Sequence, residues 1–269
     1  MLKEKIHLEK EMETLLIPLY GRAKMSEEGL CKDIYAKQTL RAIDYDFDKL
    51  KIAKKLQIFM AIRSSILDDY IKDFLETREN PLVISLGSGL DARYARMRGY
   101  REWIDLDYPE VVLLREKVLP ERENHRTIAS SVTDGEWITN LAYEDREVLV
   151  IAEGLLMYLA EDEIDRILDA LIVKFPNTTF IFDAYSKLTV RKIKGQSSLK
   201  KTGATIRWGI DNSREIESRH KNLCYIKTLY LTDEKYIGKL SYLYRVMFRL
   251  AGKFEMAKEA HRILIYQTK

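Results

Sequence analysis

The stretch PLVISLGSGLDARYARMRGYREWIDLDYPE, residues 81–110, decides the fold of this chain. It opens with an apolar, partly β-branched run at 82–86, which predicts a strand buried on both faces. Gly87 and Gly89 follow; glycine can adopt backbone angles closed to other residues and lets a ligand lie against the main chain. We expect a short helix from Leu90 to Met97, with free N–H groups at its start for an anionic group, and then a second strand at 102–107.

A carboxylate at the end of this second strand points to a nucleotide. Asp107 follows the glycine turn by about twenty residues, and a carboxylate there can accept both hydroxyls of a ribose because it has two oxygens for two donors. The segment 87–92 also satisfies the loose dinucleotide pattern in which alanine replaces the third glycine, so binding of NAD stays open. Two glycines after an apolar run also occur as an ordinary tight turn.

Acidic residues lie within the glycine turn and after the predicted strands. They are Asp91, Asp105, Asp107, Asp134, Glu153 and Asp183. An acidic rim would repel a pyrophosphate and attract a ligand that carries an amine and a sulfonium, as S-adenosylmethionine does. The charges therefore favour S-adenosylmethionine over a dinucleotide, although single acids at strand ends are often only solvated.

Three segments resemble, in order and spacing, the signature segments of the leucine carboxyl methyltransferase family: LGSGLDARYAR at 86–96, WIDLDYPEV at 103–111 and VLVIAEGLLMYL at 148–159. They look closest to a bacterial branch of polyketide O-methyltransferases. The likeness continues at IPLYGRAK (17–24), IDYDF (43–47), FDAYS (182–186) and IRWGIDN (206–212), so it covers most of the chain. Departures are mild, with Ser88 where the family often has Ala or Cys and Ala92 where it often has Thr.

The resemblance implies S-adenosylmethionine as the cofactor and a set of residues that bind it. In the family an arginine at the position of Arg63 binds the methionyl carboxylate, and Ser131 and Val132 would lie beside the adenine. A buried carboxylate at Glu153 needs a cation or a donor, which the cofactor's amine could supply. The full expected set is Arg63, Gly87, Ser88, Gly89, Asp91, Asp107, Ser131, Val132, Glu153 and Gly154.

The methyl acceptor is expected to be a small, polyketide-like molecule with a carboxylate or a phenolic hydroxyl. Candidates to orient it are Tyr20, Arg22, Lys24, Asp183, Tyr185 and Trp208, and Tyr158 could face the pocket. Holding donor carbon and acceptor oxygen close together in a dry pocket can supply most of the catalysis, so no catalytic base is assigned. Of four histidines, which stand in no metal-ligand spacing, His220 is the one worth testing as a base.

Three other functions stay open. A protein C-terminal carboxyl methyltransferase would need a site wide enough for a peptide tail. An NAD(P)-dependent Rossmann oxidoreductase would share the glycine turn and Asp107. A catalytically idle protein with this fold would bind the cofactor and transfer nothing.

The alternation of strands and helices predicts an α/β fold with helices on both faces of the sheet, and the resemblance implies a class I methyltransferase Rossmann-like sheet of seven strands with one antiparallel member. Strands are expected at 82–86, 102–107, 126–130, 147–152, 178–183, 223–229 and 261–267. Residues 1–79 would form an N-terminal helical cap or lid, and 80–269 the cofactor-binding domain, with a basic lid insertion at about 186–221. Pro18 and Gly21 argue against a regular surface helix at 16–24, which looks like a segment that folds over something.

Composition excludes several partners. A net charge of +3 is too small to imply nucleic acid, and 46% hydrophobic with 32% charged residues is ordinary for a soluble chain. No signal peptide or membrane-spanning stretch is expected, and two cysteines do not make a disulfide framework, which fits the cytoplasm. Neither the oligomeric state nor the identity of the acceptor follows from the sequence.

Overall fold

A seven-stranded sheet forms the centre of the protein. The computed structural model describes residues 4–5, 12–142, 145–194 and 205–269. The strand order is β5-β4-β3-β6-β7-β9-β8, and β9 runs antiparallel to both of its neighbours while the other strands are parallel. The strands are β3 (Leu82–Leu86), β4 (Glu102–Asp107), β5 (His125–Ala129), β6 (Val148–Ala152), β7 (Thr178–Tyr185), β8 (Leu223–Tyr230) and β9 (His261–Thr268). The predicted fold class and each predicted strand are confirmed, with ends that differ by at most two residues.

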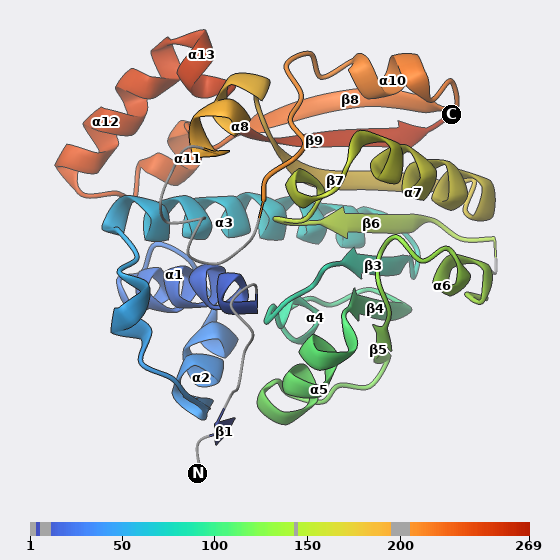
Figure 1. Cartoon of the computed structure of the whole chain (residues 1–269), viewed down its shortest axis with the longest axis horizontal. Helices are drawn as coiled ribbons and strands as arrows, with labels where there is room; N and C mark the ends of the chain where they lie inside the picture. Colours follow the sequence, from blue (N-terminus) through green and yellow to red (C-terminus); the bar gives the residue numbers. More distant parts are fainter. Residues whose placement is uncertain (1–3, 6–11, 143–144, 195–204) are drawn as a thin grey trace.

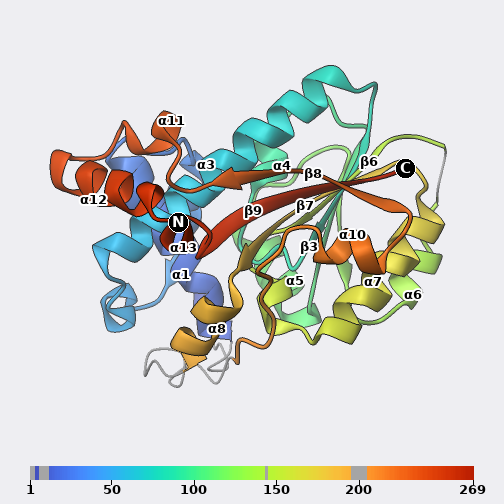
Figure 2. The ribbon, with the colours of Figure 1, turned by 90° about the horizontal axis from the view of Figure 1, so that it is seen from above.

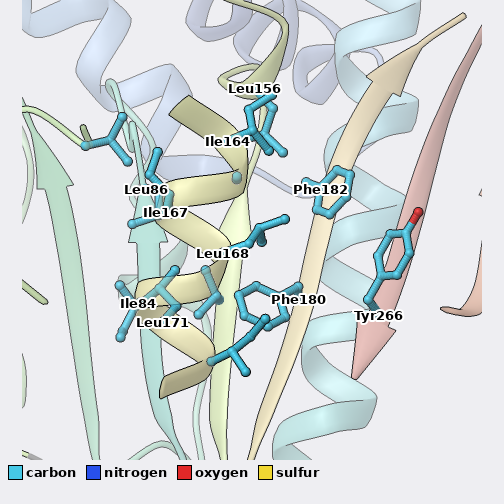
Figure 3. Close-up of a cluster of buried hydrophobic side chains, with 14 of the residues drawn as sticks. Ile84, Leu86, Leu156, Ile164, Ile167, Leu168, Leu171, Phe180, Phe182 and Tyr266 are labelled. Atoms are coloured by element: carbon cyan, nitrogen blue, oxygen red, sulfur yellow. The ribbon is translucent and has the colours of Figure 1, made fainter. Parts of the chain in front are cut away.

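Helices cover both faces of this sheet (Figure 2). On one face α7 (Glu161–Lys174) places Ile164, Ile167, Leu168 and Leu171 against Phe180 and the neighbouring strands, as Figure 3 shows. These residues recur at three- and four-residue steps, so they share one face of the helix. On the other face α3 (Lys54–Thr77) packs its own apolar side against β3, β6, β7 and β9.

The N-terminal part lies beside α3 and consists of short helices. It contains η1 (Met12–Leu15), α1 (Leu16–Glu27), α2 (Ile34–Ala42) and η2 (Phe47–Leu50), and a two-stranded ladder joins β1 (Glu4–Lys5) to β2 (Ile43–Asp44). The expectation that Pro18 and Gly21 would interrupt a helix at 16–24 was wrong, although the helix that forms is largely buried rather than a surface helix. Pro18 lies in the first turn of α1, where a missing N–H costs nothing, and Gly21 lies where α1 crosses α3. A Cβ on Gly21 would lie 3.0 Å from the Cβ of Met60, so glycine permits the close crossing.

Short helices occupy most of the connections. They are α4 (Arg93–Arg96), α5 (Pro109–Val118), α6 (Glu136–Thr139), η3 (Leu156–Tyr158), α8 (Lys187–Lys194) and α10 (Glu215–Arg219), and α11 (Glu234–Ile237), α12 (Tyr242–Lys253) and α13 (Glu255–Lys258) join β8 to β9. Figures 1 and 2 show α1, α8 and α12 gathered at the edge where β6 and β7 end. Within the expected lid at 186–221, residues 195–204 lie outside the described residues.

Candidate active site

The glycine turn lies at the switch point of the sheet, where β3 has β4 on one side and β6 on the other. Gly87 and Gly89 both have positive φ, at 58° and 50°. A Cβ on Gly87 would lie 2.8 Å from Cδ1 of Leu155, so this residue must be glycine for conformational and steric reasons alike. In open α/β sheets ligands bind at the carboxyl ends of the strands beside such a switch point.

The helix expected at 90–97 is shorter than predicted. Only Arg93–Arg96 forms a helical turn, because Met97 is extended and Gly99, at φ 90°, turns the chain toward β4. The predicted anion-binding start of a helix is therefore not formed here. Two arginine side chains, Arg93 and Arg96, come after the glycine turn in its place.

Asp107 reaches back from the end of β4 to the glycine turn. Its Oδ2 accepts the backbone N–H of Gly89 at 2.7 Å, and its Oδ1 accepts that of Tyr108 at 2.8 Å. Burial raises the pKa of Asp107, and the two N–H donors offset part of that rise. Each carboxylate oxygen has more than one acceptor position, so both oxygens can still receive a hydroxyl.

Ser88 lies between the two glycines with an unsatisfied hydroxyl. Its Oγ is buried and has no hydrogen-bond partner among the residues that the structure describes. Buried polar groups in folded proteins are nearly always paired, so an orphaned one between two glycines indicates a place for a polar ligand.

Arg63 lies at the centre of the site although it comes from the middle of α3. Its Nε donates to Oε1 of Glu153 at 2.9 Å and its Nη1 to Oδ2 of Asp183 at 2.9 Å, and only 4% of the residue is exposed. Burial alone would lower the pKa of Arg63, but Asp183 and Glu153 raise it above its ordinary value. Gly154 leaves room for the guanidinium, since a Cβ there would lie 3.4 Å from Nη1.

The pairing continues from Glu153 to the residues after the glycine turn. Arg93 bonds Glu153 at 2.8 Å, Asp68 at 2.5 Å and Asp91 at 2.5 Å. Arg96 bonds the same two aspartates at 2.8 and 3.1 Å. The two arginines therefore tie the turn to α3, which carries Asp68.

The N-terminal helices join this network through Arg22. Its Nε donates to Asp33 Oδ2 at 3.0 Å, and its Nη2 to the carbonyl of Leu90 at 3.1 Å. Asp33 in turn lies 3.6 Å from Arg96. Because Arg22 is buried and bonded in this way, it connects α1 to the glycine turn.

The acidic rim expected from the sequence is largely neutralised, and that part of the charge interpretation was wrong. Asp91, Glu153 and Asp183 each pair with an arginine. Asp105 is buried below the rim with Arg115 and His125, and the exposed Asp134 caps the N–H of Glu136. Spacing along the chain could not reveal these cations, since they come from other elements.

A small negative charge remains after the pairing. The network holds four guanidinium groups (Arg22, Arg63, Arg93, Arg96) against five carboxylates (Asp33, Asp68, Asp91, Glu153, Asp183). With Asp107 close to the same turn, the cluster favours a ligand that carries a positive charge.

Asp183 joins Arg63 to a histidine that the sequence pattern did not single out. Its Oδ2 also lies 2.7 Å from Nε2 of His261, and its Oδ1 accepts the N–H of Gly154 at 2.5 Å. Burial would raise the pKa of Asp183, but Arg63, the His261 bond and the Gly154 N–H together hold it far below its ordinary value. One signal in the sequence could have found His261. It is the first residue of the strand expected to be antiparallel, and such a strand begins at the edge of the sheet where its parallel neighbours end.

The acceptor candidates lie in different environments. Tyr185 packs against His261 with a tilt of 39° between the rings and centroids 4.3 Å apart, and it lines a cavity. Trp208 is buried against Phe182 in the core beneath α7. Tyr20 packs on Phe47 at 5.9 Å, with the ammonium of Lys24 5.7 Å from its ring centroid.

Ser131 and Val132 follow β5, as expected from the sequence. Ser131 Oγ contacts Thr133 Oγ1 at 2.8 Å, and the carbonyl of Val132 accepts the indole N–H of Trp137 at 3.2 Å. They therefore lie at the same edge of the sheet as Asp107, whose carbonyl accepts the N–H of Ser130.

His220 lies at the opposite edge, which contradicts its candidacy as a base. His220 precedes β8, whose first residue pairs with Thr268, and the hydroxyl of Thr268 accepts the N–H of the first residue of β7. His220 therefore lies at the edge where the parallel strands begin, whereas the glycine turn lies at the edge where they end. Both ring nitrogens already contact carboxylates, those of Asp169 at 2.7 Å and Asp165 at 3.0 Å.

Across the described residues, no group of three or more His, Cys, Asp or Glu could hold a metal ion. In the same ranges none of the helices has the length and apolar character needed to cross a membrane.

Comparison with known proteins agrees with this geometry. The model of the leucine carboxyl methyltransferase family matches residues 17–172. The tetracenomycin polyketide synthesis O-methyltransferase TcmP of Streptomyces glaucescens is 34% identical over 98% of both chains, and the S-adenosyl-L-methionine-dependent methyltransferase dpfgK of Gibberella zeae is 30% identical over 94% of both. The crystal structure of a SAM-dependent methyltransferase from Anabaena variabilis shares the fold at 10% identity, with a TM-score of 0.53 over 99% of this chain and 100% of that one. This chain therefore belongs to the leucine carboxyl methyltransferase family and is an S-adenosylmethionine-dependent methyltransferase.

Proposed function

We propose that this enzyme methylates a phenolic or carboxylate oxygen of a small, polyketide-like acceptor. The observation that carries the proposal is the full-length similarity to TcmP, whose name assigns it to polyketide O-methylation, since 98% of each chain is covered. When bound, S-adenosylmethionine supplies a methyl group on a sulfonium, and the protein holds the acceptor oxygen in line with it.

The residues beside the glycine turn suit the ribose and adenine of this cofactor. We assign the ribose hydroxyls to Asp107 and a polar contact to the unpaired Ser88 Oγ. Gly87 and Gly89, both with positive φ, carry no side chain that would keep a ligand from the main chain, and Ser131 with Val132 would border the adenine.

The Arg63 cluster suits the methionyl end. A guanidinium binds a carboxylate through paired hydrogen bonds, so Arg63 would receive the methionyl carboxylate and loosen one of its present bonds to Glu153 or Asp183. The carboxylate released is then available to the ammonium group of the cofactor. Asp91 would hold the arginines that follow the glycine turn in place. Gly154 would leave space for the guanidinium of Arg63.

The N-terminal helices and the lid segment would close over the acceptor. Arg22 ties α1 to the glycine turn, so residues 1–79 are suited to act as a cap on the bound cofactor. Tyr20 and Lys24 on the same helix remain candidates to border the acceptor, as does the segment at 186–221.

Methylation of a protein C-terminal carboxylate is a second candidate, because the name of the family refers to leucine carboxyl groups. The NAD(P)-dependent alternative is wrong, since the chain is an S-adenosylmethionine-dependent methyltransferase.

Product analysis separates these proposals. The purified enzyme is incubated with methyl-tritiated S-adenosylmethionine and either hydroxylated aromatic acids or peptides that end in leucine. Label recovered in an aryl methyl ether or an aromatic ester supports the proposal. Label recovered only in peptide esters would replace it with the second candidate, and the absence of any transfer despite cofactor binding would indicate a catalytically idle protein.

A further inference from the structure

A cavity of about 240 Å³ adjoins the Asp183–His261 pair. Its walls come from the first turns of α3, from α12 and α13, and from the ends of the strands at the carboxyl edge. The aromatic and basic residues of these walls include Lys55, Phe59, Tyr185, Phe248, Lys258 and His261. The rest of the lining is mainly aliphatic, so the cavity suits a small apolar ligand.

Two pairs of aromatic rings line this cavity. Phe59 and Phe248 pack together with centroids 4.9 Å apart, and Tyr185 packs against His261 with centroids 4.3 Å apart, both pairs with tilted ring planes. Aromatic rings prefer offset or tilted contacts with other rings, so these two pairs favour an aromatic guest.

Two ammonium groups at the cavity contact aromatic rings. Lys258 lies over the ring of Tyr230 at 4.0 Å and Lys55 over that of Phe59 at 5.7 Å. No acid among the described residues forms an ion pair with either of them. An acidic substituent on the guest would therefore find a partner here.

His261 connects the cavity to the Arg63 cluster. Its Nε2 lies 2.7 Å from Oδ2 of Asp183, and when Nε2–H donates to that carboxylate the other ring nitrogen, Nδ1, is the one available to the cavity. No described residue bonds Nδ1, and that atom is not sealed from the cavity or solvent. A histidine oriented by a buried carboxylate in this way is suited to remove a proton.

We propose that the cavity binds a phenolic aromatic acid as methyl acceptor and that His261 is its general base. The proposal rests on the proposed O-methyltransferase function. The phenolic oxygen bonds to the methyl carbon as the bond from that carbon to the cofactor sulfur breaks, with its electron pair left on sulfur. The phenolic proton passes to Nδ1 of His261, and Asp183 stabilises the resulting imidazolium.

The first test measures binding by calorimetry with three probes: 4-hydroxybenzoate, 6-hydroxy-2-naphthoate and 3-hydroxyanthraquinone-2-carboxylate, each with S-adenosylhomocysteine present. At least one should bind the wild type, and Ala251→Trp, which fills the cavity, should abolish that binding. Lys55→Met and Lys258→Met, at half-exposed or exposed positions, should each weaken it by a few-fold. Failure of all three probes at millimolar concentration, or binding unchanged in every variant, overturns the proposal.

The second test measures methylation of the probe that binds. His261→Gln should lower kcat by about 10²- to 10⁴-fold with little change in the acceptor's KM. Its residual rate should rise about tenfold per pH unit toward the phenol's pKa of about 10, and added imidazole should restore activity to His261→Ala. The charged groups near this ring are Asp183 from β7, Arg63 from α3 and Lys258 from α13. The pH profile of Lys258→Met therefore tests whether Lys258, rather than His261, is responsible for the pH dependence of the rate. Loss confined to KM, with an unchanged pH profile and no rescue, would assign His261 a structural role.

Binding of S-adenosylhomocysteine separates the two proposals. If the wild type binds it while every acceptor test fails, only the cavity assignment is wrong. If the wild type does not bind it, the proposed function fails as well.

Discussion

At the scale of single residues, the site consists of buried charged groups that partner one another across the fold. Sequence patterns predicted that the glycine turn and Asp107 act together, because a tight turn and a ribose site need those residue types at that spacing, and the N–H of Gly89 does bond Asp107. They did not show that Arg63, Glu153 and Asp183 meet, since Arg63 is 90 and 120 positions from its two partners. His261 was missed for the same reason.

Asp107→Ala should weaken binding of S-adenosylhomocysteine by tenfold or more, about 1.4 kcal/mol, because the ribose loses its acceptor. Burial raises the pKa of Asp107, so the wild-type affinity should be constant above that pKa and fall on acidification at a higher pH than for an ordinary aspartate. Calorimetry across the pH range measures both effects. An unchanged affinity in a folded variant would contradict the assignment of Asp107.

Asp183→Asn should lower the free energy of unfolding by about 3 kcal/mol at pH 7, because it leaves Arg63 short of a buried partner. The folded pKa of Asp183 is depressed, so its contribution is complete above the unfolded value of about 3.9 and is lost as the pH falls through the folded value. The difference between variant and wild type in urea titrations should therefore shrink only in strong acid. Asp162→Asn, which removes an exposed pair with Arg166, should change stability by less than about 1 kcal/mol. Equal losses in both variants would contradict this account.

At the scale of elements, apolar runs predicted the central strands β3, β6 and β7, because few other sequences suit a strand buried on both faces. The edge strands β5 and β8 are only partly buried, and they too lie where they were predicted. Helix ends were harder to predict. The turn after Gly89 is one helical turn where eight residues were expected, and α1 is regular although Pro18 and Gly21 argued against it. Both differences have causes outside the local sequence. Packing against α3 stabilises α1 as a helix, and the short connection to β4 leaves room for only one turn in α4.

Gly21→Val should destabilise the protein by about 1–3 kcal/mol, because the new side chain would push α1 away from Met60. Thermal unfolding followed by circular dichroism measures the loss. Gly135→Val is the matched control, since a Cβ there meets nothing within 4 Å. If both variants lose the same stability, backbone propensity rather than the α1–α3 crossing is responsible.

At the scale of the whole molecule, the parallel sheet with one antiparallel strand was predictable and the ion-pair network was not. The sequence does not give strand order, so the antiparallel last strand was expected from the family resemblance alone. The network depends on where α1, α3 and β7 bring their charges in space. The acidic residues at the strand ends thus indicated the right cofactor, but the argument from their charge was incomplete. Arginines pair with most of them and leave only a small excess of negative charge.

The central claim is that the Arg63 cluster and the glycine turn together form the S-adenosylmethionine site. Its most direct test is calorimetric titration of wild type and Arg63→Lys with S-adenosylhomocysteine, with NADH as the control ligand. The wild type should bind one equivalent of S-adenosylhomocysteine at micromolar affinity and should not bind NADH. Arg63→Lys cannot form the paired hydrogen bonds, so it should bind S-adenosylhomocysteine at least tenfold more weakly. Equal affinity in the two folded proteins would show that Arg63 lies outside the cofactor site and would contradict the claim.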